Sequence, residues 1–152
     1  MKIYKTYSES DTENFAYKFA KCLKKDSIIV LTGNLGTGKT RFMKGIARYF
    51  GIENDVSSPT FTIVNEYIPT MHKDVTEKIF HFDTYRLKDS LDFENSIGTH
   101  YFDEGLCILE WGEIIQDILP DNTIFITIKM ENEDNPCERT IYITEENLWY
   151  FQ

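Results

Sequence analysis

The spacing of apolar and polar residues in the first third of the chain predicts a helix, a strand, a loop and a second helix. Residues 10–13 read Ser-Asp-Thr-Glu, the pattern of a helix capping box, and apolar residues then recur at helical spacing to about residue 25. Residues 28–31 form an apolar run rich in β-branched side chains, which is typical of a parallel strand covered on both faces. After a glycine-rich loop, apolar residues mark one face of a helix over residues 42–50, and Gly51 follows as its stop signal.

The rest of the chain predicts further strands around this first unit. Five segments have the alternation or the continuous apolar character of strands, namely residues 62–67, 79–83, 106–110, 124–130 and 141–143. The last two are joined by an acidic loop, which favours an antiparallel pair. A short helix is expected over residues 114–119, closed by Pro120, and the polar segment 69–78 is expected to be a loop.

Together these elements predict a single α/β domain over residues 1–144. The expected architecture is a P-loop NTPase fold, in which a mostly parallel central sheet is flanked by helices and ends in an antiparallel C-terminal strand pair. Residues 146–152 read Glu-Asn-Leu-Trp-Tyr-Phe-Gln, which resembles the recognition sequence of the tobacco etch virus protease with one extra tryptophan. We interpret residues 145–152 as an expression scar, and the alternative is a native aromatic C-terminus.

Composition narrows the class of protein. With 41% hydrophobic residues, 8 glycines and 4 prolines, the chain is expected to fold and is neither collagen-like nor low-complexity. No window resembles a membrane span or a secretory signal, so we expect a cytoplasmic protein with no membrane partner. Cys22, Cys107 and Cys137 lack the spacing of a zinc site or a disulfide framework, and we expect reduced, mostly buried thiols. The net charge is 16 − 25 = −9, which disfavours charge-driven binding to nucleic acid.

Residues 33–40 read Gly-Asn-Leu-Gly-Thr-Gly-Lys-Thr and match the pattern GxxxxGK[ST]; we refer to them as the P-loop. They follow an apolar strand and precede an amphipathic helix, which is the context that this motif requires. Glycines allow backbone N–H groups to turn toward a phosphate, and the helix N-terminus adds its positive dipole end. Lys39 is expected to neutralise the β- and γ-phosphate oxygens, and the Thr40 hydroxyl is expected to hold Mg²⁺. A glycine-rich turn without a ligand has no need of that lysine.

Two acids stand at the ends of predicted strands. Asp83 follows residues 79–82, and Glu110 follows residues 106–109. The carboxyl ends of parallel strands meet at one edge of a sheet, so either carboxylate would emerge beside the P-loop if its strand neighbours the first one. Either is therefore a candidate metal-binding acid. The alternative for each is a solvated turn residue or a helix cap.

Residues 57–62 read Ser-Ser-Pro-Thr-Phe-Thr and lie between a helix and a strand, where switch segments that sense a γ-phosphate are found. Taken alone, they are an ordinary turn. Four motifs, however, occur in order: residues 33–40, 58–62, 81–87 (His-Phe-Asp-Thr-Tyr-Arg-Leu) and the pair Glu110-Trp111. In this order and at these separations the chain resembles the TsaE (YjeE) family of bacterial ATPases over about residues 8–144.

The resemblance implies a P-loop ATPase that binds ATP and Mg²⁺ and is needed for the threonylcarbamoyladenosine modification of tRNA. It implies a complex with the transferase subunit TsaD and its partner TsaB, with tRNA reached only through that complex. By this resemblance Lys39 contacts the phosphates, Thr40 and Glu110 bind Mg²⁺, and Asp83 positions water or makes a further metal contact. The nucleotide contacts expected on the same basis are Thr12, Gly33, Asn34, Leu35, Gly36, Thr37, Gly38, Lys39, Thr40, Arg41, Thr60 in the switch-like position, and Arg139.

The chain departs from the family pattern at three positions. Asn34 replaces an acid, Thr84 replaces an apolar residue, and Gly112 stands where proline is frequent. None of these changes removes a group that the chemistry needs.

Three residues in or beside these motifs each have two possible roles. His81 either takes part in proton transfer or fills a buried polar niche, and we favour a role in supporting the site. Arg86 either supplies charge to a transition state or pairs with Asp83 or Asp89. Trp111 is either exposed at the site or part of the core.

Two other functional classes are compatible with a P-loop. The first is a nucleotide-binding regulator whose bound state, not its turnover, controls a partner. The second is a small-molecule kinase, which would need a lid with clustered arginines. The chain's arginines are dispersed, at positions 41, 48, 86 and 139, so no such lid is visible. Hydrolysis that depends on the two acids and on partner proteins would favour the ATPase over the regulator.

Overall fold

The computed structural model describes residues 1–34, 36–52, 56 and 64–144. In chain order its elements are β1 (Lys2–Thr6), α1 (Glu9–Phe19), the 3₁₀ helix η1 (Ala20–Cys22), β2 (Ile28–Thr32), α2 (Lys39–Tyr49), β3 (Val64–Tyr67), β4 (Ile79–Asp83), α3 (Ser90–Ser96), α4 (Tyr101–Glu104), β5 (Leu106–Glu110), the 3₁₀ helix η2 (Gly112–Ile118), β6 (Ile124–Lys129) and β7 (Arg139–Thr144). The interpretation of residues 145–152 stays a prediction, because they lie outside this range.

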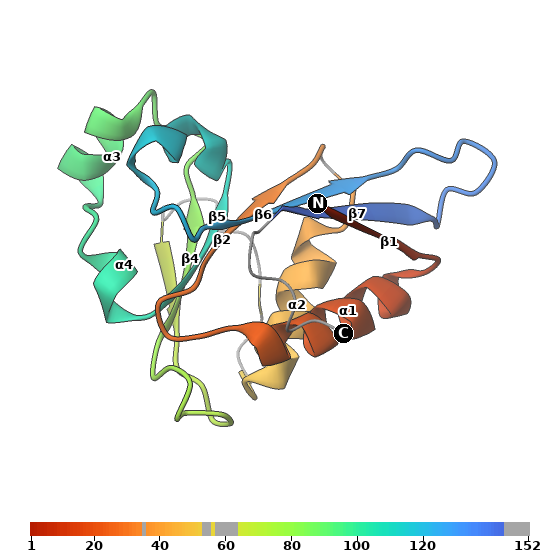
Figure 1. Cartoon of the computed structure of the whole chain (residues 1–152), viewed down its shortest axis with the longest axis horizontal. Coiled ribbons are helices and arrows are strands. Elements are labelled where there is room, and N and C mark those ends of the chain that lie inside the picture. Colours follow the sequence, from red (N-terminus) through yellow and green to blue (C-terminus); the bar gives the residue numbers. More distant parts are fainter. Residues whose placement is uncertain (35, 53–55, 57–63, 145–152) are drawn as a thin grey trace.

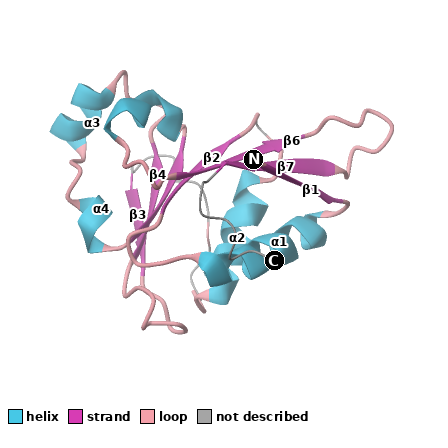
Figure 2. Ribbon diagram, viewed as in Figure 1, coloured by secondary structure: helices cyan, strands magenta, loops and turns pink. Residues whose placement is uncertain are grey.

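The strands form one twisted sheet between two layers of helices, as Figures 1 and 2 show. The strand order is β1-β7-β6-β2-β5-β4-β3. The four central strands, β6, β2, β5 and β4, run parallel, whereas β7 pairs antiparallel with β6 and β3 pairs antiparallel with β4. The predicted fold class and the antiparallel C-terminal pair are therefore confirmed.

Apolar side chains on the two faces of the sheet form two separate cores, because successive residues of a strand point to opposite faces. Ile29 and Leu31 of β2 belong to the core that α1 and α2 cover. Ile28 and Val30 belong to the core shared with α3, α4 and η2. Strand β2 is thus covered on both sides, which explains why its apolar run is unbroken.

Helix α2, which begins at the P-loop lysine, packs closely against α1. A Cβ atom on Gly45 would collide with the carbonyl oxygen of Glu13 and lie 2.6 Å from the Ala16 Cβ, so this close approach requires glycine. The rings of Phe19 and Phe42 lie 5.7 Å apart between the same helices, and both side chains are fully buried. This packing holds the start of α2 in place against the sheet.

The beginning of the chain differs from the prediction in two respects. The N-cap of α1 is Ser8, not Ser10: the Ser8 hydroxyl accepts a 3.0 Å hydrogen bond from the Asp11 backbone N–H, and the Asp11 carboxylate accepts one from Tyr7. Ser8 and Ser10 each stand three residues before an acid, Asp11 and Glu13 respectively. The capping interaction forms at Ser8, where the acid is an aspartate. The helix also ends in the turn Ala20–Cys22, before residue 25. Strand β1, which pairs antiparallel with β7, is not predicted by the pattern.

Three other segments complete the comparison with the prediction. Residues 69–78 form a loop, as expected, and the helix expected at 114–119 is the 3₁₀ helix η2. Helices α3 and α4 are not predicted; they are short, at 7 and 4 residues. Across the described ranges, no helix has both the length and the apolar character that crossing a bilayer requires.

Candidate functional site

The P-loop joins the end of β2 to the start of α2 in the conformation that its glycines allow. Gly33, Gly36 and Gly38 have φ angles of 146°, 82° and 111°, which residues with a Cβ rarely adopt. Gly38 is the N-cap of α2, and Lys39 and Thr40 begin that helix. The loop therefore presents a helix N-terminus beside a glycine-rich turn, the arrangement that binds phosphate groups.

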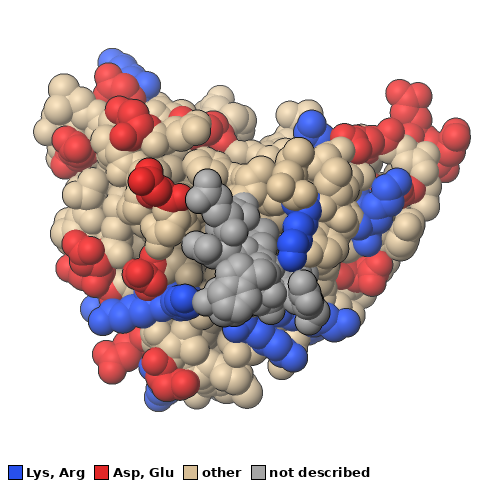
Figure 3. All heavy atoms as spheres, viewed as in Figure 1, with Lys and Arg blue, Asp and Glu red and all other residues tan. Residues whose placement is uncertain are grey.

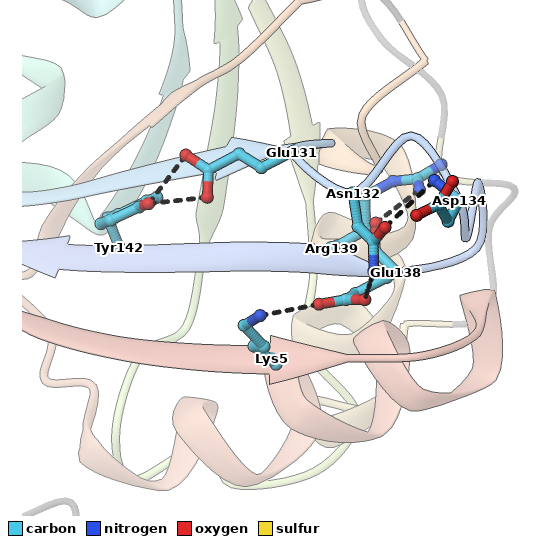
Figure 4. Close-up of polar contacts among 7 residues, drawn as sticks. All are labelled: Lys5, Glu131, Asn132, Asp134, Glu138, Arg139 and Tyr142. Carbon is cyan, nitrogen blue, oxygen red and sulfur yellow. Dashed lines mark hydrogen bonds and ion pairs between the residues drawn. The ribbon is translucent and has the colours of Figure 1, made fainter.

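Hydrogen bonds hold the loop from within and from β7. The Thr37 hydroxyl and backbone N–H both donate to the Asn34 carbonyl, at 2.8 and 3.2 Å. The Arg139 guanidinium donates to the carbonyls of Thr37 and Gly36, at 2.9 and 3.4 Å. It also donates to the Glu138 carbonyl at 3.0 Å, at the base of the β6–β7 connection drawn in Figure 4. Arg139 thus braces the P-loop backbone, a role that its spacing in the sequence does not indicate.

A cavity of about 190 Å³ brings three further predicted residues to the P-loop. It is bounded by Gly36, Thr37 and Gly38 together with Thr12, Arg41 and Arg139. The Thr12 hydroxyl lies 2.7 Å from that of Thr6, and its methyl carbon would lie 3.8 Å from a Cβ placed on Gly38. The Arg41 guanidinium forms ion pairs with Glu9 at 2.9 Å and Glu13 at 3.4 Å. Six of the predicted nucleotide contacts, from α1, the P-loop, α2 and β7, therefore surround one small cavity.

Glu110 lies beside the P-loop strand, as predicted. Strand β5 is the parallel neighbour of β2, and Glu110 is in register with Leu31. Its side chain is buried, and its Oε2 atom accepts a 3.0 Å hydrogen bond from Nε2 of His81. Since the carboxylate accepts, Nε2 carries a proton; the other ring nitrogen, Nδ1, is buried and has no hydrogen-bond partner in the described part of the chain. His81 is thus buried and bonded to the candidate acid, which agrees with a buried polar niche and with a supporting role; proton transfer by His81 stays a prediction.

Asp83 lies one strand farther from the P-loop than Glu110. It is in register with Glu110, but β4 neighbours β5 and not β2. Its Oδ1 atom accepts a 3.0 Å hydrogen bond from the Tyr85 backbone N–H, so the turn role considered for it is present. A metal or water contact through Asp83 stays a prediction.

The surroundings of Trp111 and Arg86 bear on the two interpretations given for each residue. Trp111 is 39% exposed, and its ring centroid lies 5.2 Å from both the Lys39 ammonium nitrogen and the Tyr85 ring centroid. It is thus a site residue in contact with the P-loop lysine, not a core residue. Arg86 is exposed, and among the described residues no ion pair joins it to Asp83 or Asp89, so both of its interpretations stay predictions.

A larger cavity of about 830 Å³ adjoins Gly33 and Asn34. Its other walls include the exposed apolar side chains of Tyr85, Trp111 and Met130. Exposed apolar surface of this kind is common where another molecule binds. Tyr85 and Met130 are absent from the predicted site. Tyr85 lies within the motif of residues 81–87, but the motif alone indicates no role for it, and Met130 is a strand-end residue with no motif around it.

The residues present fit a nucleotide with Mg²⁺. Thr40 offers a hydroxyl in the first turn of α2, and Glu110 offers a carboxylate on the neighbouring strand. Over the described ranges no three His, Cys, Asp or Glu side chains are grouped to hold a metal. Mg²⁺ in phosphate sites takes one or two protein oxygens and completes its shell with phosphate and water, so this sparse set is suitable. Two predicted nucleotide contacts, Leu35 and Thr60, lie outside the described residues, as does the switch-like segment 57–62.

The strand, loop and helix, with a buried acid on the adjacent parallel strand, define a P-loop α/β protein. The chain belongs to the TsaE family: the family model described as "Threonylcarbamoyl adenosine biosynthesis protein TsaE" matches residues 6–141. The resemblance stated from the four motifs is therefore confirmed.

Individual relatives agree over most of their length. Proteins named "tRNA threonylcarbamoyladenosine biosynthesis protein TsaE" from Bacillus subtilis (strain 168) and Rickettsia bellii (strain RML369-C) are 34% and 38% identical to the chain over 141 and 140 residues. These matches span 93% and 91% of this chain, and 84% and 92% of the relatives. A solved structure described as "Crystal structure of Bacillus subtilus YdiB" superposes with a TM-score of 0.70 at 29% identity, covering 98% of this chain and 88% of that one.

Proposed function

We propose that this protein is a Mg²⁺-dependent ATP-binding and ATP-hydrolysing subunit required for the threonylcarbamoyladenosine modification of tRNA, acting in the cytoplasm. The observation that carries the proposal is the P-loop itself, with three glycines at positive φ, followed by Lys39 at the helix start and flanked by buried Glu110. A connecting turn needs neither that lysine nor a buried acid. Membership of the TsaE family supports the pathway.

Each residue has a distinct role in this proposal. The backbone N–H groups of the P-loop surround the phosphates, and the Lys39 ammonium neutralises the β- and γ-phosphate oxygens. Thr40 and Glu110 would hold Mg²⁺, which when bound neutralises charge that develops on the phosphates. His81 keeps the Glu110 carboxylate in place. Asp83, whose Oδ1 atom is held by the Tyr85 N–H, would orient the attacking water through its other oxygen.

Hydrolysis by the isolated chain should be slow. Arg41 is paired with two glutamates, and Arg139 donates to backbone carbonyls, so neither is free to reach a transferring phosphoryl group. Arg86 is exposed. An arginine supplied in cis or in trans is worth about 10³ to 10⁵ in rate. A partner that orders Arg86 or supplies its own arginine would therefore accelerate turnover.

The partners in this proposal are the TsaD transferase subunit and TsaB, and tRNA is reached only through their complex. Figure 3 shows acidic side chains over α3 and α4 and at the β6–β7 connection, which would repel a phosphate backbone. The larger cavity, bounded by Tyr85, Trp111 and Met130, instead offers apolar surface next to the P-loop. A protein seated there would contact the nucleotide face directly.

Copurification with TsaB and TsaD of the same cell, followed by an ATPase assay with and without them, tests the proposal. We expect a nucleotide-dependent complex and faster hydrolysis in it. A complex that forms with bound ATP but never hydrolyses it would favour the nucleotide-binding regulator instead. Absence of nucleotide binding would exclude both.

A further inference from the structure

Thr84, the residue after β4, makes an unusual set of contacts with the chain that follows β5. Its side chain is 0% exposed. Its hydroxyl lies 2.8 Å from the Trp111 carbonyl oxygen and 3.0 Å from the Glu110 carbonyl oxygen, and its backbone N–H donates to the Glu110 carbonyl at 3.1 Å. A hydroxyl has one hydrogen, which here is shared between two carbonyls. Thr84 thus holds both carbonyls that flank the Trp111 backbone.

These contacts matter because Trp111 has a left-handed backbone, with φ at 63° and ψ at 22°. That conformation is unfavourable for a residue with a bulky side chain and persists only when the surroundings hold it. The Glu110 carbonyl precedes the φ rotation of Trp111, and the Trp111 carbonyl follows its ψ rotation. A group bound to both carbonyls therefore opposes any change in these two angles.

The left-handed turn determines where the indole lies. Its ring centroid is 5.2 Å from the Lys39 ammonium nitrogen, within the range of a cation–π contact. The Tyr85 ring lies 5.2 Å from it as well. The indole therefore restrains the long Lys39 side chain. The position of the indole itself depends on Thr84.

We propose that Thr84 is a positioning residue that acts through Trp111 to hold Lys39 ready for a nucleotide phosphate. The inference rests on the proposed function, because it assumes that Lys39 binds phosphate. Restricting a flexible side chain before binding lowers the entropy lost on binding, and we expect a two- to tenfold effect on ATP affinity.

The test compares Thr84→Val, which keeps the shape but removes the donor, with Thr84→Ser, which keeps the donor. The full chain is used with Trp149→Phe, so that Trp111 is the one remaining tryptophan. Without nucleotide, acrylamide should quench Trp111 emission more strongly in Thr84→Val than in the parent or Thr84→Ser. ATP affinity by calorimetry should fall about two- to tenfold in Thr84→Val and be retained in Thr84→Ser. Urea unfolding checks that each variant is folded.

Trp111→Leu supplies the decisive control and a second route if Thr84→Val does not fold. It should weaken ATP binding to a similar extent, and adding Thr84→Val to it should cause no further loss. Unchanged affinity in Trp111→Leu, or an equal loss from Thr84→Val with and without Trp111, would overturn the inference. Lys39→Ala separates the two claims. If Lys39→Ala binds ATP normally, the proposed function fails. If Lys39→Ala does not bind ATP but Thr84→Val and Trp111→Leu bind it normally, only this inference fails.

Discussion

His81 and Glu110, on the adjacent parallel strands β4 and β5, form a buried pair in which Nε2 of the imidazole lies 3.0 Å from Oε2 of the carboxylate. Both side chains are almost fully buried. A buried carboxylate needs hydrogen-bond donors to offset its lost hydration. The histidine inside an otherwise apolar strand is therefore accounted for by the acid on the next strand.

Replacing His81 tests this relationship. His81→Leu removes one hydrogen bond from a buried carboxylate and should cost about 1.5–3 kcal/mol of unfolding free energy, measured by urea denaturation. His81→Gln, whose amide nitrogen reaches a position close to Nε2, should recover most of that loss. Equal stability of the leucine variant and the parent would show that the pair contributes nothing.

Lys39→Ala should abolish tight ATP binding while leaving the fold intact. The P-loop keeps its backbone donors in this variant but loses the point charge directed at the β- and γ-phosphates. Calorimetry gives the affinity, and circular dichroism gives the folded state. Wild-type affinity in a folded variant would contradict the assignment of residues 33–40 as a nucleotide site.

Glu110→Gln should keep the shape of the site but remove the charge proposed to bind Mg²⁺. Hydrolysis in the presence of TsaB and TsaD should collapse, and ATP binding should lose most of its dependence on Mg²⁺. Asp83→Asn should also fail in turnover but should keep the Mg²⁺ dependence of binding, because its strand lies farther from the P-loop. Normal hydrolysis by Glu110→Gln with both partners present would mean that the metal role is wrong.

Cys107 and Cys137 should react very differently with thiol reagents. The expectation of mostly buried thiols is wrong, because Cys107 is buried but Cys22 is half-buried and Cys137 is exposed. Cys137 is exposed and lines the 190 Å³ cavity at the P-loop, whereas Cys107 is buried, and burial raises the pKa of its thiol to about 12. A raised pKa keeps the thiol protonated at pH 8, so Cys107 lacks the reactive thiolate there.

A thiol reagent at pH 8 should therefore label Cys137 rapidly and Cys107 only after unfolding. ATP with Mg²⁺ should slow labelling of Cys137, because the nucleotide would fill the cavity that this residue borders. Cys137→Ser identifies the fast phase. Labelling of Cys137 at the same rate with saturating ATP would place the nucleotide elsewhere.

Free tRNA should be a poor ligand of the isolated chain. Each phosphate contact needs a cation, and a net charge of −9 lowers the encounter rate through long-range repulsion. A gel-shift titration at physiological salt should show weak or no binding, whereas the TsaB and TsaD pair should recruit the chain in a nucleotide-dependent way. Submicromolar tRNA binding without a partner would favour an enzyme that handles RNA directly.

Much of the P-loop could be predicted from the sequence because its determinants are local. Only glycine readily adopts the positive φ angles found at Gly33, Gly36 and Gly38, so the residue types alone indicate the turn. The apolar run of β2 and the one-sided apolar pattern of α2 are likewise properties of neighbouring residues. Two features near the N-terminus were harder to predict. Overlapping capping patterns start at Ser8 and Ser10, and β1 is an edge strand whose Lys2 and Lys5 weaken its apolar signal.

Contacts between distant parts of the chain were decided only by the tertiary structure. The sequence places Asp83 and Glu110 alike, each at the end of a strand, but the strand order sets Glu110 beside β2 and Asp83 one strand away. Arg139 reaches the Thr37 carbonyl from 102 positions along the chain, and Thr84 reaches Trp111 from 27. Hydrophobic periodicity reports which face of an element is buried but not which element covers it, because that choice depends on how all the strands pair and pack at once.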